Sequence, residues 1–160
     1  MAYQASQGNN SFPFILQGVG FIKDTQTVLT DGSRTVILAQ YTIMAQVAST
    51  SKWVPWLNAN LGGTTGTQYP MGILMNDGGI SAASLAAGDV TGADILYAGH
   101  GCEIDASQLV FDGGSTGVGT LNTLASVPTV PTNLAIQAEQ ILVLKGIIPV
   151  TTVAVDNLEN

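Results

Sequence analysis

One short segment holds the side chains in this chain that could bind a metal ion or act as a nucleophile: His100, Cys102, Glu103 and Asp105. A structural zinc site takes four Cys or His ligands, and the chain has one Cys and one His in total. A Cys–His catalytic pair needs a third group to orient the histidine, and no feature of the sequence marks one. We therefore expect neither a metal site nor a catalytic residue here.

Two glycine-rich segments, 62–66 and 113–119, resemble phosphate-binding loops in composition alone. Neither is followed by Lys-Ser or Lys-Thr, and Gly117-Val118-Gly119 does not continue to a third glycine at the start of a helix. The eleven carboxylates are scattered, with no close pair placed for acid–base work. These segments therefore predict turns, and we expect no enzyme activity and no cofactor.

The overall composition limits the partners of the protein. A chain of 160 residues suits one domain, with or without an arm. Hydrophobic residues make up 46% and charged residues only 9%, so uncharged polar residues and glycine must cover the surface. That surface fits a protein that works in an assembly, and also an ordinary soluble protein. The net charge of -7 argues against nucleic-acid and membrane partners, which attract cationic side chains.

The sequence also bears on where the protein is made. Cys102 is the single cysteine, so no disulfide can form within the chain. The first residues lack the basic start and apolar run of a signal peptide, and the longest apolar stretches fall short of the roughly 20 residues that span a bilayer. We expect a soluble protein made in a cytoplasm.

The N-terminal region allows two interpretations. Residues 1–11 are small and polar and cannot order themselves by burial. The apolar stretch that follows is either the first strand of the core or an arm that docks on a partner through Phe12, Phe14, Ile15 and Leu16. We assign the chain to an arm over 1–27, a domain over 28–155 with an insertion at 113–131, and a polar tail over 156–160.

Several segments have strand patterns. The region 28–47 is the most strand-like, and its apolar residues lie on both faces, as in strands buried on both sides. Asp31-Gly32 predicts a turn before a strand over 36–38. Further short strands are expected at 95–98, 109–111 and 147–150, a loop at 88–92, and either a helical turn or a loop at 81–87. Pro149 cannot donate a ladder hydrogen bond, so its strand should lie at a sheet edge or end there.

One helix is expected, over residues 133–145. Its apolar stripe consists of Leu134, Ala138, Ile141 and Leu142. Asn133 can cap its start and Gly146 ends it. The fold class is therefore α+β, mainly β, with one C-terminal helix.

The segment from Gly66 to Leu74 is the one around which we expect the chain to be organised. Glycines and Pro70 restrict a polar loop that tightens into a buried strand at Ile73-Leu74. Upstream, Trp53 and Trp56 flank Val-Pro. We favour core or subunit contacts for both rings over a ligand platform, and each indole N–H then needs an acceptor.

These segments together resemble a known family. Val54-Pro55-Trp56-Leu57, then Gly63-Thr64-Thr65-Gly66, then Pro70-Met71-Gly72-Ile73-Leu74 is similar to the central block of the bacteriophage head decoration (capsid cement) proteins of the lambda type. The segments 95–105 and 109–111 are similar to the next part of that family. The closing helix, with Lys145-Gly146-Ile147-Ile148 and Val150, is similar to its terminal helix and Gly-Ile strand. The resemblance covers roughly residues 50–112 and 132–152. The longer N-terminal region, the insertion at 113–131 and the tail depart from it.

The resemblance implies a small β-barrel-like (β-tulip) fold that forms a homotrimer. It implies a structural virion protein on the outer surface of an icosahedral head, at three-fold and quasi-three-fold positions. There the trimer would bind the major capsid protein through the arm and stabilise the head against DNA pressure. Its trimer or core contacts would include Trp53, Trp56, Tyr69 and Pro70. The alternative is another β-type virion or surface module, such as a tail or fibre component, or a carbohydrate binder that uses Trp53, Trp56 and Tyr69.

Overall fold

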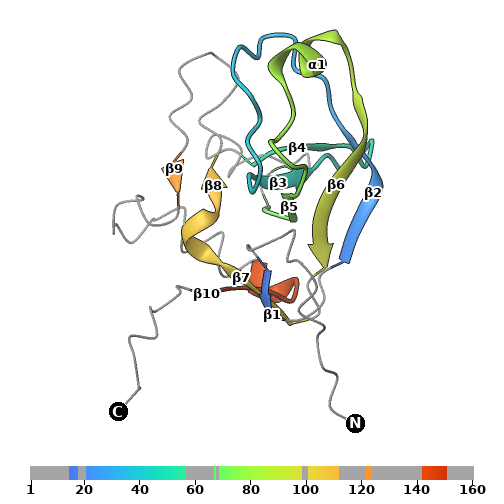
Figure 1. The fold of residues 1–160 in the computed structure, drawn as a ribbon. Helices are drawn as coiled ribbons and strands as arrows, with labels where there is room; N and C mark the ends of the chain where they lie inside the picture. The colour runs from blue at the N-terminus through green and yellow to red at the C-terminus, as the bar shows by residue number, and fades with distance from the viewer. Residues whose placement is uncertain are drawn as a thin grey trace, which may run out of the picture.

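The computed structural model describes residues 15–17, 21–56, 67, 69–98, 101–111, 122–123 and 142–150. At its centre is a closed barrel with the strand order β2-β4-β3-β5-β6 (Figure 1). The barrel strands are β2 (Phe21–Val28), β3 (Ile43–Gln46), β4 (Trp53–Pro55), β5 (Gly72–Leu74) and β6 (Val90–Ala98). The predicted fold class, mainly β with little helix, is confirmed.

A second, smaller sheet lies below the barrel in Figure 1. Its order is β1-β7-β10, made of β1 (Ile15–Gln17), β7 (Cys102–Asp105) and β10 (Ile147–Val150). The short 3-10 helix η2 (Ala106–Gln108) follows β7, and β8 (Val110–Phe111) then pairs with β9 (Asn122–Thr123). Part of the segment expected to be an irregular insertion therefore forms a strand.

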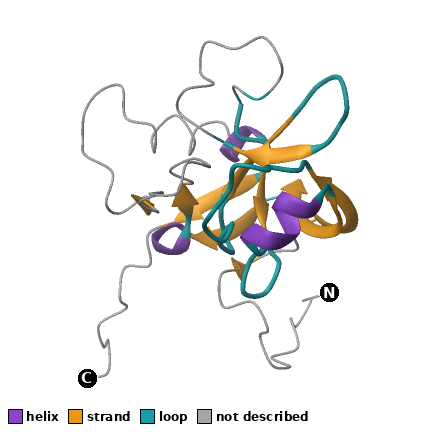
Figure 2. Ribbon diagram, turned by 90° about the horizontal axis from the view of Figure 1, so that it is seen from above, coloured by secondary structure: helices purple, strands orange, loops and turns teal. Residues whose placement is uncertain are grey.

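Helix α1 (Ala82–Ala87) settles the alternative left open at residues 81–87. Ser81 caps it, because its Oγ accepts a hydrogen bond from the Ser84 backbone N–H at 3.1 Å. The helix lies at the upper end of the barrel in Figure 1, and over the strands in the view from above (Figure 2). Its Leu85 is buried in a core cluster with Leu38 and Ile80, so α1 closes that end of the barrel core.

The expected strand at residues 36–38 is wrong. Within it, only Leu38 forms a bridge, to Ile80, and Ile37 is 45% exposed. The buried guanidinium of Arg34 donates to the carbonyl oxygens of Val36, at 2.9 Å, and of Ile37, at 3.3 Å. These carbonyl oxygens therefore accept hydrogen bonds from a side chain instead of from the backbone of a neighbouring strand.

The loop expected over residues 88–92 is wrong from Val90 onward, where β6 begins. Long-range pairing with β2 extends this strand, from Val28↔Val90 to Phe21↔Ala98. The register skips one residue between Ala93 and Thr91, and Gly92 at that point has φ +73°. Gly92 is thus the extra residue of a β-bulge, a role that suits glycine because it adopts positive φ without a Cβ clash.

The N-terminal boundary also differs from the expected one. Residues 21–27, which we assigned to the arm, belong to β2 of the barrel. Ile15 and Leu16 belong to β1, and Ile15 packs against the core cluster that contains Trp56. Within the single chain, these residues therefore form a strand of the small sheet. Phe12 and Phe14 lie outside the described residues.

The C-terminal helix is described only at its end. Residues 142–144 are helical, and Gly146, with φ +74°, follows them. Leu142 of the predicted stripe is buried, whereas Leu134, Ala138 and Ile141 lie outside the described residues.

The edge position predicted for the strand at 147–150 is confirmed. β10 runs parallel to β7 at one side of the sheet. Since the Gly146 carbonyl accepts from the Cys102 N–H at 3.0 Å, the register directs the peptide groups of Ile148 toward β7 and those of Pro149 away from it. The N–H that proline lacks would therefore have pointed away from the ladder.

Strand β5 confirms the buried strand expected after Pro70, and Gly72 begins it. All three residues of β5 are buried, between β3 on one side and β6 on the other. A Cβ on Gly72 would lie 2.7 Å from the Leu96 carbonyl oxygen, 2.9 Å from Ile95 Cγ2 and 3.0 Å from Trp53 Cζ3. These contacts are too short for a real Cβ, so this position requires glycine.

We expect Gly72→Ala to lower the free energy of unfolding by about 1–3 kcal/mol, and Gly72→Val by more, because backbone of β6 must move. Chemical denaturation followed by circular dichroism measures the change. Gly32→Ala is the matched control, since a Cβ there meets nothing within 4 Å. Unchanged stability of Gly72→Val would show that β5 does not organise the barrel.

Candidate functional site

The segment with metal-ligand side chains is built into the small sheet. Cys102 is fully buried in β7, and burial, with the nearby Glu103 carboxylate, raises the pKa of its thiol. A thiol held in its protonated form is a poor nucleophile and a poor metal ligand. Asp105 is nine-tenths buried and accepts a hydrogen bond from Gln108 Nε2 at 2.8 Å, which fastens η2 to β7. His100 lies outside the described residues. Within the described ranges no group of three His, Cys, Asp or Glu could hold a metal ion.

The aromatic residues at 53, 56 and 69 do not share a surface. Trp53 is 2% exposed and Trp56 is fully buried, and they belong to different core clusters. Pro70 is buried as well, whereas Tyr69 is 53% exposed. The sugar-stacking platform considered for Trp53, Trp56 and Tyr69 therefore does not exist in this fold.

Trp53 instead links three barrel strands. Its Nε1–H donates to Gln26 Oε1 of β2 at 2.5 Å, which gives the indole the acceptor it needs. Its ring is tilted by 52° against Tyr97 of β6, with the ring centroids 6.3 Å apart. The same ring lies against Gly72 of β5. Trp53 thus packs the barrel interior rather than binding a ligand.

Trp burial gives a direct solution test. We expect acrylamide to quench the Trp fluorescence of the folded protein far less than that of the protein unfolded in urea, because both rings are shielded. Tyr69→Phe is the matched control and should leave the quenching unchanged. Equal quenching of the folded and unfolded forms would contradict this burial and restore the ligand platform.

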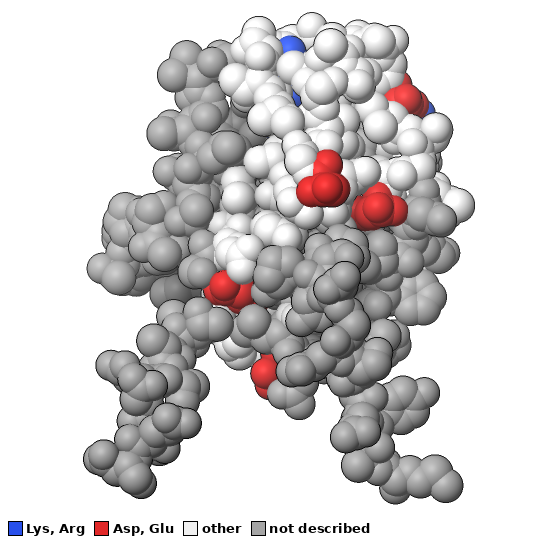
Figure 3. Space-filling model, in the orientation of Figure 1, with Lys and Arg blue, Asp and Glu red and all other residues white. Residues whose placement is uncertain are grey.

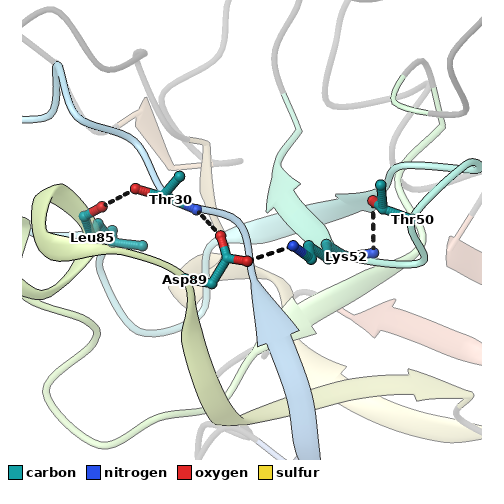
Figure 4. Close-up of polar contacts among 5 residues, drawn as sticks. All are labelled: Thr30, Thr50, Lys52, Leu85 and Asp89. Atoms are coloured by element: carbon teal, nitrogen blue, oxygen red, sulfur yellow. Dashed lines mark hydrogen bonds and ion pairs between the residues drawn. The ribbon is translucent and has the colours of Figure 1, made fainter.

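A polar network ties the barrel where β2 and β4 meet (Figure 4). These two strands pair at Val28↔Trp53 only, with one further bond from Leu29 N–H to the Trp53 carbonyl at 2.8 Å. Beside this short pairing, Lys52 Nζ lies 2.5 Å from Asp89 Oδ2. Asp89 Oδ1 accepts from the Thr30 backbone N–H at 2.9 Å, and Thr30 Oγ1 donates to the Leu85 carbonyl at 2.7 Å. The network therefore joins the ends of β2 and α1 to the residue that precedes β4.

The hydrogen bond from Lys52, followed by that from the Thr30 backbone, lowers the pKa of Asp89. A carboxylate whose folded pKa is lowered stabilises the fold fully above its unfolded pKa of about 4, and this stabilisation is lost as the pH falls through the lower folded value. Because both side chains are partly exposed, salt also weakens the pair.

We therefore expect Asp89→Asn to lower the melting temperature at pH 7 and to have a progressively smaller effect as the pH falls below about 4. Thermal unfolding of both proteins between pH 2 and 7 measures this. Asp77→Asn, which removes another exposed carboxylate, is the matched control. A melting-temperature difference that stays constant across this range would rule out the ionised Asp89 as its source.

Four large apolar side chains are exposed in the described part of the chain. They are Leu144 at 84%, Tyr69 at 53%, Val143 at 47% and Ile37 at 45%. Val143 and Leu144 adjoin each other in the helical turn that precedes β10. Uncharged atoms predominate on the described surface in Figure 3, with a few separate acidic groups. Tyr69 and Ile37 lie on other segments of the chain, apart from Val143 and Leu144 in the sequence.

Sequence reasoning placed Trp53, Trp56 and Pro70 among core or subunit contacts, and the single chain buries all three. It did not find Val143 and Leu144, because a helical stripe predicts the buried face and not whether its opposite face is covered. None of the family models, curated proteins or solved structures compared with this chain matches it. No helix in the described ranges is long and apolar enough to cross a membrane.

Proposed function

We propose that this chain is a structural virion protein, a trimeric decoration protein of an icosahedral phage head. It is made in the host cytoplasm and binds the major capsid protein on the outer surface, at three-fold and quasi-three-fold sites. There it holds neighbouring capsid subunits together against the pressure of the packaged DNA.

The observation that carries the proposal is where the family-like segments lie. The segments similar to head decoration proteins include 54–57, 70–74 and 95–105, which are far apart in the sequence. Parts of them form β4, β5 and β6 of one barrel, and the last continues into β7 beside β10, itself a family-like segment. The resemblance therefore falls on strands of the barrel and of the small sheet, and we base the proposal on it.

The surface is also consistent with this role. A cementing contact buries apolar side chains and pairs backbone groups, and neither needs charge. The exposed Leu144 and Val143, together with only 9% charged residues, provide such a surface. Contacts of this kind are little weakened by salt, because screening acts on charges.

The capsid-binding element in this proposal is the segment 1–14, which precedes β1. An extended segment can add to the edge of a capsid sheet, and the apolar side chains of Phe12 and Phe14 can enter pockets beside it. Pro13 cannot donate a hydrogen bond, so the paired stretch lies to one side of it. Ordering costs about 1–2 kcal/mol per residue, so backbone pairing and buried aromatic rings must jointly exceed that cost.

We expect deletion of residues 1–14 to leave a folded protein that no longer decorates heads, because β1 and the barrel are kept. The test is to mix the truncated protein with undecorated heads of the phage that encodes it and to sediment the mixture. The double variant Phe12→Ser/Phe14→Ser should lose binding, while the matched polar change Gln4→Ser should not. Full occupancy by the truncated protein would show that the segment is not the binding element.

A further inference from the structure

We propose that β1 is exchanged between copies, so that Ile15–Gln17 of one chain pairs with β7 of the next chain around the trimer. The inference rests on the trimeric part of the proposed function and is independent of head binding. It identifies a contact surface, the outer edge of β7, and one occupant, the β1 strand of a second copy.

The first argument is that β1 is weakly attached to its own chain. It has three residues, about 10 Å of strand. In the described part of the structure it pairs with β7 alone, at Ile15↔Ile104 and Gln17↔Glu103, with an irregular register between the two positions. Ile15 is only partly buried. A three-residue edge strand opens more easily than the barrel core.

The second argument is that β7 requires a strand at this edge. Its Cys102 and Ile104 side chains are fully buried, and β10 occupies its other edge. Release of β1 would leave peptide groups of β7 unpaired, which is an open template for another strand. A β1 strand from a second copy restores the same hydrogen bonds and the same Ile15 contact without any new complementarity. The occupant that fits this edge is therefore another copy of the chain.

The third argument is the position of the exposed apolar residues. The register places Gln17 opposite Glu103 and Ile147 opposite Cys102, so β1 ends and β10 begins at the same end of β7. The turn that carries Val143 and Leu144 leads into β10 at that end, where the Gly146 carbonyl accepts from Gly101 N–H at 2.8 Å. The copy that donates β1 must therefore lie at this end of the receiving chain's small sheet, because its β1 continues there toward its own β2. In that position it can cover Leu144 of the receiving chain, which is 84% exposed.

The connection to the barrel has the sequence expected of a hinge. β1 is joined to β2 by Gly18-Val19-Gly20, and the two glycines allow backbone angles that other residues avoid. A short connection keeps the donated strand close to its own barrel and so brings the two copies into contact. Three such head-to-tail contacts close a ring, which is the geometry of a cyclic trimer.

Disulfide trapping distinguishes exchange from pairing within one chain. Gln17 and Glu103 are paired across antiparallel strands, and such Cα atoms lie about 4.5–5.5 Å apart, within disulfide range. The variants Gln17→Cys and Glu103→Cys are made in a Cys102→Ser background, given tags of different mass, co-expressed and oxidised. Exchange predicts a linked dimer with one copy of each on a non-reducing gel. The control pair, Gln17→Cys with Ser51→Cys at an exposed loop position, should give none.

The double variant Gln17→Cys/Glu103→Cys gives the complementary result. Exchange predicts a covalent trimer, whereas a linked monomer alone, together with no dimer from the co-expressed pair, would overturn the proposal. Light scattering on the uncrosslinked protein then separates the claim that β1 is exchanged from the claim that the protein is a trimer. A trimer mass with only intrachain links refutes exchange and keeps the trimer, and a monomer mass refutes both.

A second variant tests the covered surface. Leu144→Ser should weaken trimer formation by about tenfold or more, because a buried contact becomes polar, whereas Lys145→Gln should not. Dilution followed by light scattering measures the change in association. Equal association of Leu144→Ser and the parent protein would overturn the claim that a second copy covers this end of the sheet.

Discussion

The barrel depends on one close approach, the contact of Gly72 with β6 and Trp53. Without a Cβ at Gly72, β5 can lie against the Leu96 carbonyl and the Trp53 ring at the same time. Trp53 also links β4 to β2, because its indole N–H donates a hydrogen bond to the Gln26 side chain. Since β2 and β4 pair at one position only, this side-chain packing, with the Lys52–Asp89 pair beside it, is what closes the barrel.

The small sheet has a different role from the barrel. Trp53 and Trp56 are buried in the two core clusters, and burial raises the pKa of the Cys102 thiol and so keeps it protonated. The first and last described strands, β1 and β10, both lie on β7, and the exposed Leu144 adjoins β10. Under the proposed function, the small sheet is the part of the chain that would contact other copies.

Local chemistry decided how much could be predicted from the sequence. Pro149 correctly predicted an edge strand, and Pro70 correctly predicted the buried strand that contains Ile73 and Leu74. Both predictions succeeded because proline restricts the backbone only within a few residues. The extent of β2 and β6 could not be predicted, since their pairing joins residues from 62 (Val28↔Val90) to 77 (Phe21↔Ala98) positions apart and places Gly92 in a bulge. The strand at 36–38 failed because Arg34 binds its carbonyls. The exposure of Leu144 depends on what the rest of the fold leaves uncovered, which no local pattern reports.

The central claim is that the protein stabilises phage heads, and the thermal stability of DNA-filled heads tests it most directly. Heads from a phage that lacks the gene are heated with and without the purified protein, and DNA release is followed with a dye that fluoresces on DNA. The account predicts release at a lower temperature from bare heads, and restoration of the normal temperature when the protein is added to saturation. Identical release temperatures for bare and saturated heads, with the protein bound, would contradict it.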